Sequence, residues 1–306
     1  VMHPFRFGAM VGQADDRRLW LDQVRMADSL GYSTVLISDH FSDKLAPLPA
    51  LVMAAEHTAL RIGTLVLASD FRHPAVLAKE AATVDLLSGG RLELGIGTGW
   101  EEGDYLAAGI ARDAPGTQVD RFEEAIEILS GLWSPGPVDY DGEHYQIHVD
   151  GLPKPGPGRP TLLIGGGGER MLGLAGRHAD IVGISAAELT TRADLARGIT
   201  RAGDLLDSKL DWIRAGAGER FESLELNILL FGVGVGDRTD EAARLAEQWG
   251  GSPEGILASP HFLAGTIDQI TADLINRRER WGISYPAVPQ AALQSLAPVV
   301  QDLTGT

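Results

Sequence analysis

The chain has 306 residues, of which 44% are hydrophobic and 22% charged, and its formal net charge is −16. These proportions are near those of soluble globular proteins and allow a large buried core, whereas the acidic balance argues against nucleic acid or an anionic membrane as a partner. The absence of cysteine excludes disulfides, thiolate metal sites and cysteine nucleophiles.

Short apolar segments alternate with longer amphipathic segments, which is the pattern of repeated βα units around a parallel sheet. Residues 5–10 resemble a strand, and residues 17–30 carry apolar side chains at helical spacing before Gly31 ends the helix. The β-branched run at residues 34–38 predicts a second strand. Further strands are expected at residues 61–68 and 91–97, and helices at residues 48–59 and 76–87.

The second half of the chain continues this alternation after a helix at residues 117–133. Residues 134–160 are rich in Pro, Gly and Tyr, and predict an excursion outside the barrel that contains a small hairpin. Strands are expected at residues 161–164, 180–184, 224–235 and 283–288. Helices are expected between the first two of these strands, at residues 189–213, 240–249 and 267–281, and at the end of the chain.

Eight strand candidates favour an α/β fold, a (β/α)8 TIM barrel with insertions, over an open doubly wound sheet. We expect residues 1–306 to form a single domain, because barrels of this class commonly have ~250 residues before insertions. No stretch approaches the ~20 apolar residues of a membrane span, and residues 1–4 do not begin a basic and apolar leader. We therefore expect an unexported, cytoplasmic protein.

Polar residues that follow the strands are the candidates for chemistry, because active sites of such barrels form at the carboxyl ends of the strands. Asp39 and His40 follow the second strand, and an adjacent acid and imidazole suit general acid–base catalysis. A helix cap followed by a surface histidine is the alternative. Arg72 follows the third strand and suits either a phosphate or carboxylate ligand or a salt-bridged loop.

Glycines follow two of the predicted strands. At residues 95–100 they allow a planar ring to approach the backbone, and Trp100 suits an aromatic wall. Gly95 and Gly97 resemble the start of a dinucleotide fingerprint, but Trp100 occupies the third glycine position. Four glycines at residues 165–168 open a helix whose amides and dipole suit a phosphate, with a flexible hinge as the alternative.

No nucleotide-hydrolysis loop, zinc-protease motif or nucleophile elbow occurs, and the eight histidines show no spacing typical of a metal site. We therefore expect no metal. The remaining chemistry suits an organic cofactor held by its phosphate.

The sequence resembles the luciferase-like oxidoreductase superfamily, and more closely its branch of probable F420-dependent enzymes. The resemblance covers nearly the whole chain and is carried by residues 38–40, 71–74, 87–100, 131–133, 259–266 and 282–285. It implies a luciferase-like TIM barrel with the ring of a flavin or deazaflavin in its mouth. Asp39 and His40 match the pair near the reactive face of that ring.

The resemblance also implies the contacts that hold the cofactor. A non-proline cis peptide is expected within residues 65–69, with Leu65–Val66 as the favoured position. Thr98, with Gly99 and Trp100 after it, matches a position that contacts the ring or tail. The phosphate loop matches three glycines: Gly166, Gly167 and Gly168. The F420-dependent sugar-phosphate dehydrogenases carry a glutamate where this chain has Trp100, so their proton donor is absent. The candidate replacements are Glu101, Glu102 and Asp104.

The resulting hypothesis is an F420-dependent oxidoreductase that transfers hydride between the deazaflavin and an unidentified small organic substrate. The alternatives are an FMN-dependent monooxygenase on the same barrel and a non-catalytic flavin-binding protein. Basic residues that favour the anionic tail of F420 are Arg72, Lys79 and Arg170. Residues 134–160 and 184–223 are expected to shape the substrate pocket. Trp100, Tyr140 and Tyr145 suit either the lining of an apolar cavity or ordinary core packing. The resemblance implies a homodimer.

Overall fold

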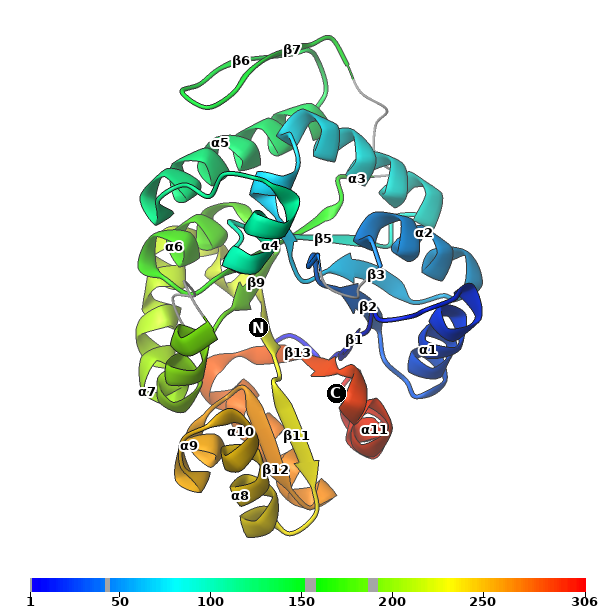
Figure 1. Cartoon of the computed structure of the whole chain (residues 1–306), viewed down its shortest axis with the longest axis vertical. Helices are drawn as coiled ribbons and strands as arrows, with labels where there is room; N and C mark the ends of the chain where they lie inside the picture. Colours follow the sequence, from blue (N-terminus) through cyan, green and yellow to red (C-terminus); the bar gives the residue numbers. More distant parts are fainter. Residues whose placement is uncertain (1, 42–44, 152–157, 187–191) are drawn as a thin grey trace.

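The computed structural model describes residues 2–41, 45–151, 158–186 and 192–306. Within these ranges eight parallel strands form a closed ring in the order β1-β2-β3-β5-β8-β9-β10-β13, and helices surround it (Figure 1). The predicted (β/α)8 TIM barrel is confirmed. In that order the ring strands are Gly8–Met10, Thr34–Ile37, Arg61–Thr64, Leu92–Gly97, Thr161–Gly166, Ile181–Ile184, Glu225–Leu229 and Ile283–Pro289.

Local sequence signals set the ends of several outer helices. The Asp16 carboxylate accepts a hydrogen bond from the Leu19 amide at the start of α1, and Thr266 forms a capping box with Gln269 at the start of α10. Gly89, with φ 72°, ends α3 in the left-handed conformation and turns the chain toward β5. The helices that surround the ring are α1 (Arg17–Ser29), α2 (Pro47–His57), α3 (Pro74–Ser88), α5 (Pro115–Trp133), α6 (Glu169–His178), α7 (Arg192–Ala217), α10 (Ile267–Trp281) and α11 (Leu293–Leu303).

The predicted helix at residues 189–213 corresponds to α7, and its first three residues lie outside the described ranges. Among the described helices, none combines the length and the apolar character that a membrane span requires.

The predicted strand at residues 61–68 is interrupted in its middle. Strand β3 ends at Thr64, a non-proline cis peptide joins Leu65 to Val66, and β4 (Leu67–Ala68) then pairs with β5. The cis peptide expected at Leu65–Val66 is thereby confirmed.

The prediction of one strand at residues 224–235 was wrong. The Leu230 amide still bonds to the Ala287 carbonyl of the barrel, but the Phe231 amide bonds to the His261 carbonyl, so the chain leaves the ring. It continues as β11 (Gly232–Val235), which pairs with β12 (Phe262–Gly265), a strand that the sequence analysis missed. An unbroken apolar run does not reveal where a strand changes its partner.

Three further helices accompany these departures from the simple barrel. Helix α8 (Arg238–Trp249) was predicted in part, whereas α4 (Glu102–Ala108) and α9 (Pro253–Ala258) were not predicted. Strands β11 and β12 lie with α8 and α9 at the end of the molecule opposite the hairpin of β6 (Val138–Asp141) and β7 (Gln146–Val149) (Figure 1).

The hairpin expected within residues 134–160 is confirmed as β6 (Val138–Asp141) and β7 (Gln146–Val149). The Glu124 carboxylate of α5 accepts hydrogen bonds from the backbone amides of its turn, at Glu143, His144 and Tyr145. The hairpin therefore lies against the outer side of α5, away from the barrel mouth (Figure 1).

A buried ion network holds the amino-terminal ends of the strands together. Glu93 of β5, 0% exposed, accepts hydrogen bonds from Arg6 at 2.6 Å, from Arg61 at 2.5 Å and from the Tyr285 hydroxyl at 2.9 Å. Arg6 also binds both carboxylate oxygens of Glu225 at 2.6 Å. Because these residues come from five places around the ring, their charges compensate one another only in the closed barrel.

Replacing Glu93 by glutamine should lower the free energy of unfolding by about 3–5 kcal/mol, because two guanidinium groups lose their buried counter-ion. Urea denaturation followed by circular dichroism measures this change. The matched control is Asp207→Asn, which breaks an exposed pair with Arg280 and should leave the free energy of unfolding almost unchanged. Equal effects of the two substitutions would contradict the role given to the network.

Candidate active site

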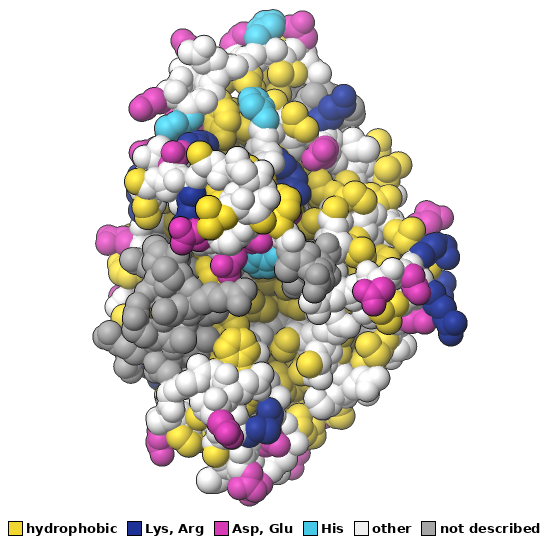
Figure 2. All heavy atoms as spheres, viewed as in Figure 1, with side chains coloured by type: hydrophobic (Ala, Val, Ile, Leu, Met, Phe, Trp, Pro, Cys, Tyr) yellow, Lys and Arg dark blue, Asp and Glu magenta, His cyan; other side chains and the backbone are white. Residues whose placement is uncertain are grey.

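A cavity of about 840 Å³ opens where the carboxyl ends of the ring strands meet. Most of its wall is apolar, and its polar groups come from the loops that follow the strands. In Figure 2 hydrophobic side chains line the central hollow of this face, with acidic and histidine side chains at its edge. Its apolar members are Met10, Leu65, Val66, Ala68, Phe71, Trp100, Pro115, Val119, Met171, Ile184, Leu229, Phe231 and Trp249.

The structure brings the predicted site residues together. They come from the ends of β2, β3, β5 and β8, which are distant in sequence but adjacent around the rim. The residues concerned are Asp39, His40, Leu65, Val66, Thr98, Gly99, Trp100, Gly166, Gly167 and Gly168, and each lines the cavity.

His40 is held by a buried carboxylate. Its Nδ1 lies 2.6 Å from Asp104 Oδ2, and Asp104 Oδ1 accepts a hydrogen bond from the Phe41 amide at 2.9 Å. Since a carboxylate only accepts hydrogen bonds, Nδ1 carries a proton, which leaves Nε2 as the proton acceptor whenever the ring is neutral. Trp100 lies edge-to-face with the imidazole at 6.1 Å. The interpretation of His40 as a surface residue was wrong.

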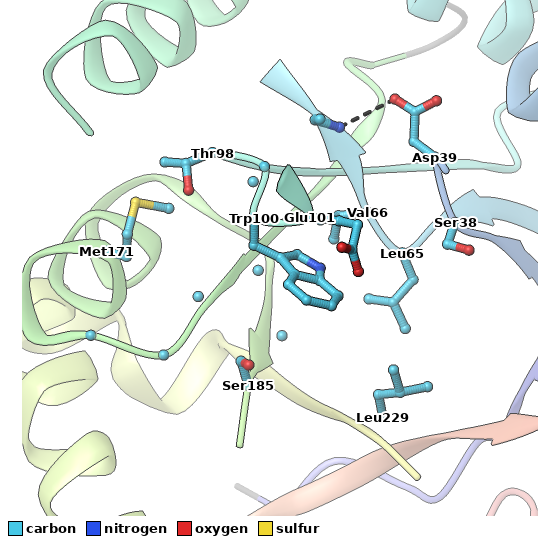
Figure 3. Close-up of a pocket in the computed structure, with 18 of the residues that line it drawn as sticks. Ser38, Asp39, Leu65, Val66, Thr98, Trp100, Glu101, Met171, Ser185 and Leu229 are labelled. Carbon is cyan, nitrogen blue, oxygen red and sulfur yellow. Dashed lines mark hydrogen bonds between the residues drawn. The ribbon is translucent and has the colours of Figure 1, made fainter. Parts of the chain in front are cut away.

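Asp39 orders the loop after β3. Its carboxylate binds Arg72 through both oxygens, at 2.5 and 3.1 Å, and accepts a hydrogen bond from the Ala68 amide at 3.2 Å, the dashed line in Figure 3. Arg72 is thus part of a salt-bridged loop and does not line the cavity, so its alternative as a phosphate ligand was wrong. Asp39 therefore affects the cavity by fixing the backbone that follows β3.

Val66 lies where three glycines leave room for its side chain. A Cβ atom on Gly95, Gly97 or Gly165 would lie 3.3, 3.0 and 3.0 Å respectively from a Val66 methyl carbon. Larger residues at the ends of β5 and β8 would therefore displace Val66. Figure 3 shows Leu65 and Trp100 projecting into the same space, so this part of the wall is apolar.

Thr98 contributes its backbone to a buried network. Its carbonyl oxygen lies 3.1 Å from the Tyr105 hydroxyl and 3.4 Å from Gln118 Nε2, and both groups also contact Asp70 Oδ2, at 3.0 and 2.9 Å. Burial and the nearby Asp70 carboxylate raise the pKa of Tyr105, so it stays protonated. Sequence analysis missed Tyr105 and Gln118 because they project from helices α4 and α5 rather than from strand ends.

The glycine turn, residues 165–168, leaves β8 and enters α6 with Gly168 as the N-cap, and its backbone lines the cavity. The first residues of α5, Pro115 and Gly116, line the same cavity. Arg112 also lines it, its Nε is buried without a hydrogen-bond partner, and it forms no ion pair within the described part of the chain. Two helix amino-termini and an uncompensated cation make this sector suitable for an anion.

His261 is a further residue that the sequence analysis did not single out for chemistry. It precedes β12, is 1% exposed and lines the cavity. Its Nδ1 donates a hydrogen bond to the Leu229 carbonyl at 2.8 Å, and burial lowers its pKa to about 3. The imidazole is therefore neutral at physiological pH, and its Nε2 is an acceptor.

Several expectations about the pocket were wrong. Tyr140 and Tyr145 pack against the outside of the barrel, where Tyr140 donates to Glu127 and Tyr145 contacts the ring of His73. No described residue of 134–160 lines the cavity, because the hairpin lies beyond α5. Lys79 is exposed on α3. Arg170 does line the cavity, but it is paired with Asp120 and Glu123.

Of the three candidates to replace the missing glutamate, Glu101 and Asp104 line the cavity and Glu102 does not. Asp104 is engaged with His40, as described above. Of residues 184–223, only Ile184 and Ser185 are among the described lining residues, and the side chains of residues 192–204 lie outside the described part.

The sequence of this chain is similar to those of known enzymes. The sequence model of the family described as Luciferase-like monooxygenase matches residues 1–282. An F420-dependent glucose-6-phosphate dehydrogenase from Nocardia farcinica is 31% identical over 219 residues, covering 66% of this chain and 65% of that protein. The chain spans about half to two thirds of the length of the curated relatives it matches.

Solved structures share the fold over almost the whole chain. An F420-dependent secondary alcohol dehydrogenase in complex with an F420-acetone adduct has a TM-score of 0.77 at 18% identity, covering 98% of each chain. A long-chain alkane monooxygenase has a TM-score of 0.77 at 14% identity, covering 99% of this chain and 92% of that one. At these identities they establish the barrel only.

The depressed pKa of His261 makes stability depend on pH. Between pH 6.5 and about 3 the unfolded chain binds a proton at this residue and the folded chain does not, so stability falls as the pH falls through that window. His261→Asn keeps a donor for the Leu229 carbonyl and removes the titration. The variant should lose less stability over this range, by at most about 1.4 kcal/mol per pH unit, in urea denaturation at several pH values. Parallel pH curves for the two proteins would refute the assignment.

Proposed function

We propose that this chain, which belongs to the luciferase-like monooxygenase family, is an F420-dependent oxidoreductase that transfers hydride between the deazaflavin and an organic substrate. The observation that carries the proposal is His40, whose Nε2 makes no hydrogen bond within the described part of the chain, in a largely apolar cavity lined by Leu65 and Val66. The curated relatives named as F420-dependent enzymes support the choice of cofactor.

The cavity fits a flat tricyclic ring. Its volume of about 840 Å³ lies within the range of cofactor sites, ~300–1,000 Å³. Leu65 and Val66 would lie against one side of the ring, and Trp100 would cover its edge. The backbone of Gly97 and Thr98 would contact its polar atoms, since glycine lets the main chain come close.

We call the glycine turn, the first residues of α5 and Arg112 the anion sector. It fits the tail of F420, which carries a phosphate and acidic glutamates. The glycine turn would hold the phosphate, and Arg112 would neutralise a further negative charge. The net charge of −16 makes such a local cation necessary for an acidic ligand.

When bound, F420 accepts or donates a hydride as a two-electron carrier. His40 Nε2 takes the proton of a substrate hydroxyl during oxidation and returns it during reduction. Asp104 holds the imidazole in the required tautomer and stabilises its protonated form, which is the role of a buried carboxylate behind a catalytic histidine. Trp100 and Phe71 exclude water from the reacting atoms.

An FMN-dependent monooxygenase is the second candidate. The shared fold of the long-chain alkane monooxygenase and the suitability of the glycine turn for any cofactor phosphate favour it. Arg112 argues for the more acidic cofactor, because FMN has no charge beyond its single phosphate.

Fluorescence titration of the purified protein with F420 and with FMN tests the choice of cofactor. F420 should bind, and Arg112→Gln should weaken that binding about tenfold at low salt, with a smaller effect at high salt. Arg170→Gln is the matched control, because Arg170 is already paired with Asp120 and Glu123. Binding of FMN without binding of F420 would replace the proposal by the second candidate.

Asp104→Asn should slow hydride transfer at least about a hundredfold, because an amide can donate to Nδ1 and so place the proton on Nε2. The measurement is F420 absorbance in a screen of alcohols and carbonyl compounds, with kcat followed against pH. Glu102→Gln is the control on the same helix and should react at the wild-type rate. An Asp104→Asn enzyme with the wild-type rate and pH profile would exclude this role.

A further inference from the structure

One half of the cavity rim has no part in the proposed function. The residues assigned to the cofactor follow β3, β5 and β8 or belong to the anion sector, and His40 follows β2. The four remaining ring strands, β9, β10, β13 and β1, are neighbours around the ring, and we call them the β9–β1 arc. A substrate that exchanges hydride with the cofactor must lie directly beside it. The β9–β1 arc therefore borders the space that the substrate would occupy.

The polar side chains of the β9–β1 arc are mostly closed to a ligand. Asn227 and His261 line the cavity but are each 1% exposed, and burial keeps the His261 imidazole neutral by lowering its pKa to about 3. The nearby cation of Lys209 is 3% exposed, is not a lining residue, and donates to the Ser185 carbonyl at 2.5 Å. Within the described part of the chain, this arc therefore presents no charged side chain to the cavity.

Four apolar side chains of the same arc remain half-buried where they border the cavity. They are Met10, Leu229, Phe231 and Trp249. Figure 3 shows the Leu229 side chain pointing toward Leu65, with the indole of Trp100 beside them. Apolar surface that stays open in a cavity favours an apolar ligand, because binding removes both surfaces from water.

A hydrophobic cluster inside the barrel joins this arc to the cofactor residues. Met10 and Leu229 pack against the cluster, and so do Leu65 and Val66. The apolar surface therefore continues without a break from the residues proposed to contact the ring to the β9–β1 arc. The buried members of the cluster are Leu36, Leu163, Ile181, Tyr285 and Ala287.

Phe231 and Trp249 are held in place by a second hydrophobic cluster, which strands β11 and β12 form with α8 and α9. The ring centroid of Phe231 lies 5.6 Å from that of Trp249 and 5.3 Å from that of His261. Trp249 also lies edge-to-face with the buried Phe262 at 6.0 Å. Because neighbouring rings fix both side chains, a ligand meets a preformed aromatic surface and has little ordering to do.

We infer that Phe231 and Trp249, with Met10 and Leu229, form a subsite that binds the apolar group of the substrate. This inference deepens the proposed function, on which it rests for placing the reacting hydroxyl or carbonyl group at His40. The substrate is accordingly a neutral alcohol or carbonyl compound that carries an alkyl or aryl group of several carbon atoms. The part of the molecule that lies outside the simple barrel thereby determines substrate specificity.

Ligand-observed NMR titration of the purified protein with 2-butanol, 2-pentanol, 2-hexanol and 2-octanol tests the subsite. The dissociation constant should fall about threefold for each added methylene group, because the apolar wall removes each one from water. 1-Methoxy-2-propanol has an ether oxygen in place of one methylene group of 2-pentanol. It should bind at least about fivefold more weakly than 2-pentanol, because the oxygen finds no donor on this wall.

Trp249→Ala should weaken the binding of 2-octanol about tenfold and that of 2-butanol less than about twofold, because the lost indole contacts the longer chain only. Phe231→Ala should act in the same direction and carries the test if Trp249→Ala folds poorly. The matched control is Trp281→Ala, which removes another half-buried tryptophan, on α10 and outside this cavity. It should leave the binding of both alcohols unchanged.

Binding that does not depend on chain length, or a dependence that survives both subsite substitutions, would overturn the inference. F420 titration of the same samples separates the two proposals. Trp249→Ala should bind F420 as tightly as the wild type, and a parallel loss of F420 affinity would place Trp249 in the cofactor site and also overturn the inference. F420 binding without the chain-length dependence removes only the subsite, whereas the dependence without F420 binding supports the subsite and removes only the cofactor.

Discussion

Closure of the ring between β3 and β5 is the constraint on which the site depends. The two strands pair at Ile62–Leu92 and Gly63–Glu93, and beyond these pairs a Cβ atom on Gly95 would lie 1.8 Å from the Thr64 carbonyl oxygen. Glu93 and its cationic partners secure the same seam from the amino-terminal end. Because all the ring strands run in one direction, closure gathers their carboxyl ends, and the loops that follow them, around one cavity.

Different sectors of the rim carry different polar side chains. The sector after β2 and β5 holds His40, with Asp104 behind it. The sector at the glycine turn and the start of α5 holds Arg112, and the sector after β10 holds Asn227 and His261. Each depends on a partner from another element, such as α4 for His40 or the β10 carbonyl for His261. A rigid sheet thus allows separate loops to place these side chains around one cavity independently of one another.

Charged residues show why position in the sequence is not enough to assign roles. Arg72 follows a ring strand directly, yet Asp39 neutralises it, and Arg170 enters the cavity already paired. Arg112 lies in a loop between two helices and carried no signal in the sequence, yet it is the cavity-lining cation without an ion pair among the described residues. Whether an arginine binds a ligand is decided by the carboxylates around it, and these come from distant parts of the chain.

The sequence by itself favoured the barrel and predicted the β6–β7 hairpin and the residues at the ends of β2, β3, β5 and β8, because alternating apolar periodicity and glycine-rich strand exits are local properties. Its resemblance to a known superfamily added the cis peptide at Leu65–Val66. Only the tertiary structure decided that residues 224–235 divide between two sheets, that Asp104 pairs with His40, and that Asn227 and His261 are among the residues that line one cavity. These features depend on hydrogen-bond partners far away in the chain, which no local pattern of residues can specify.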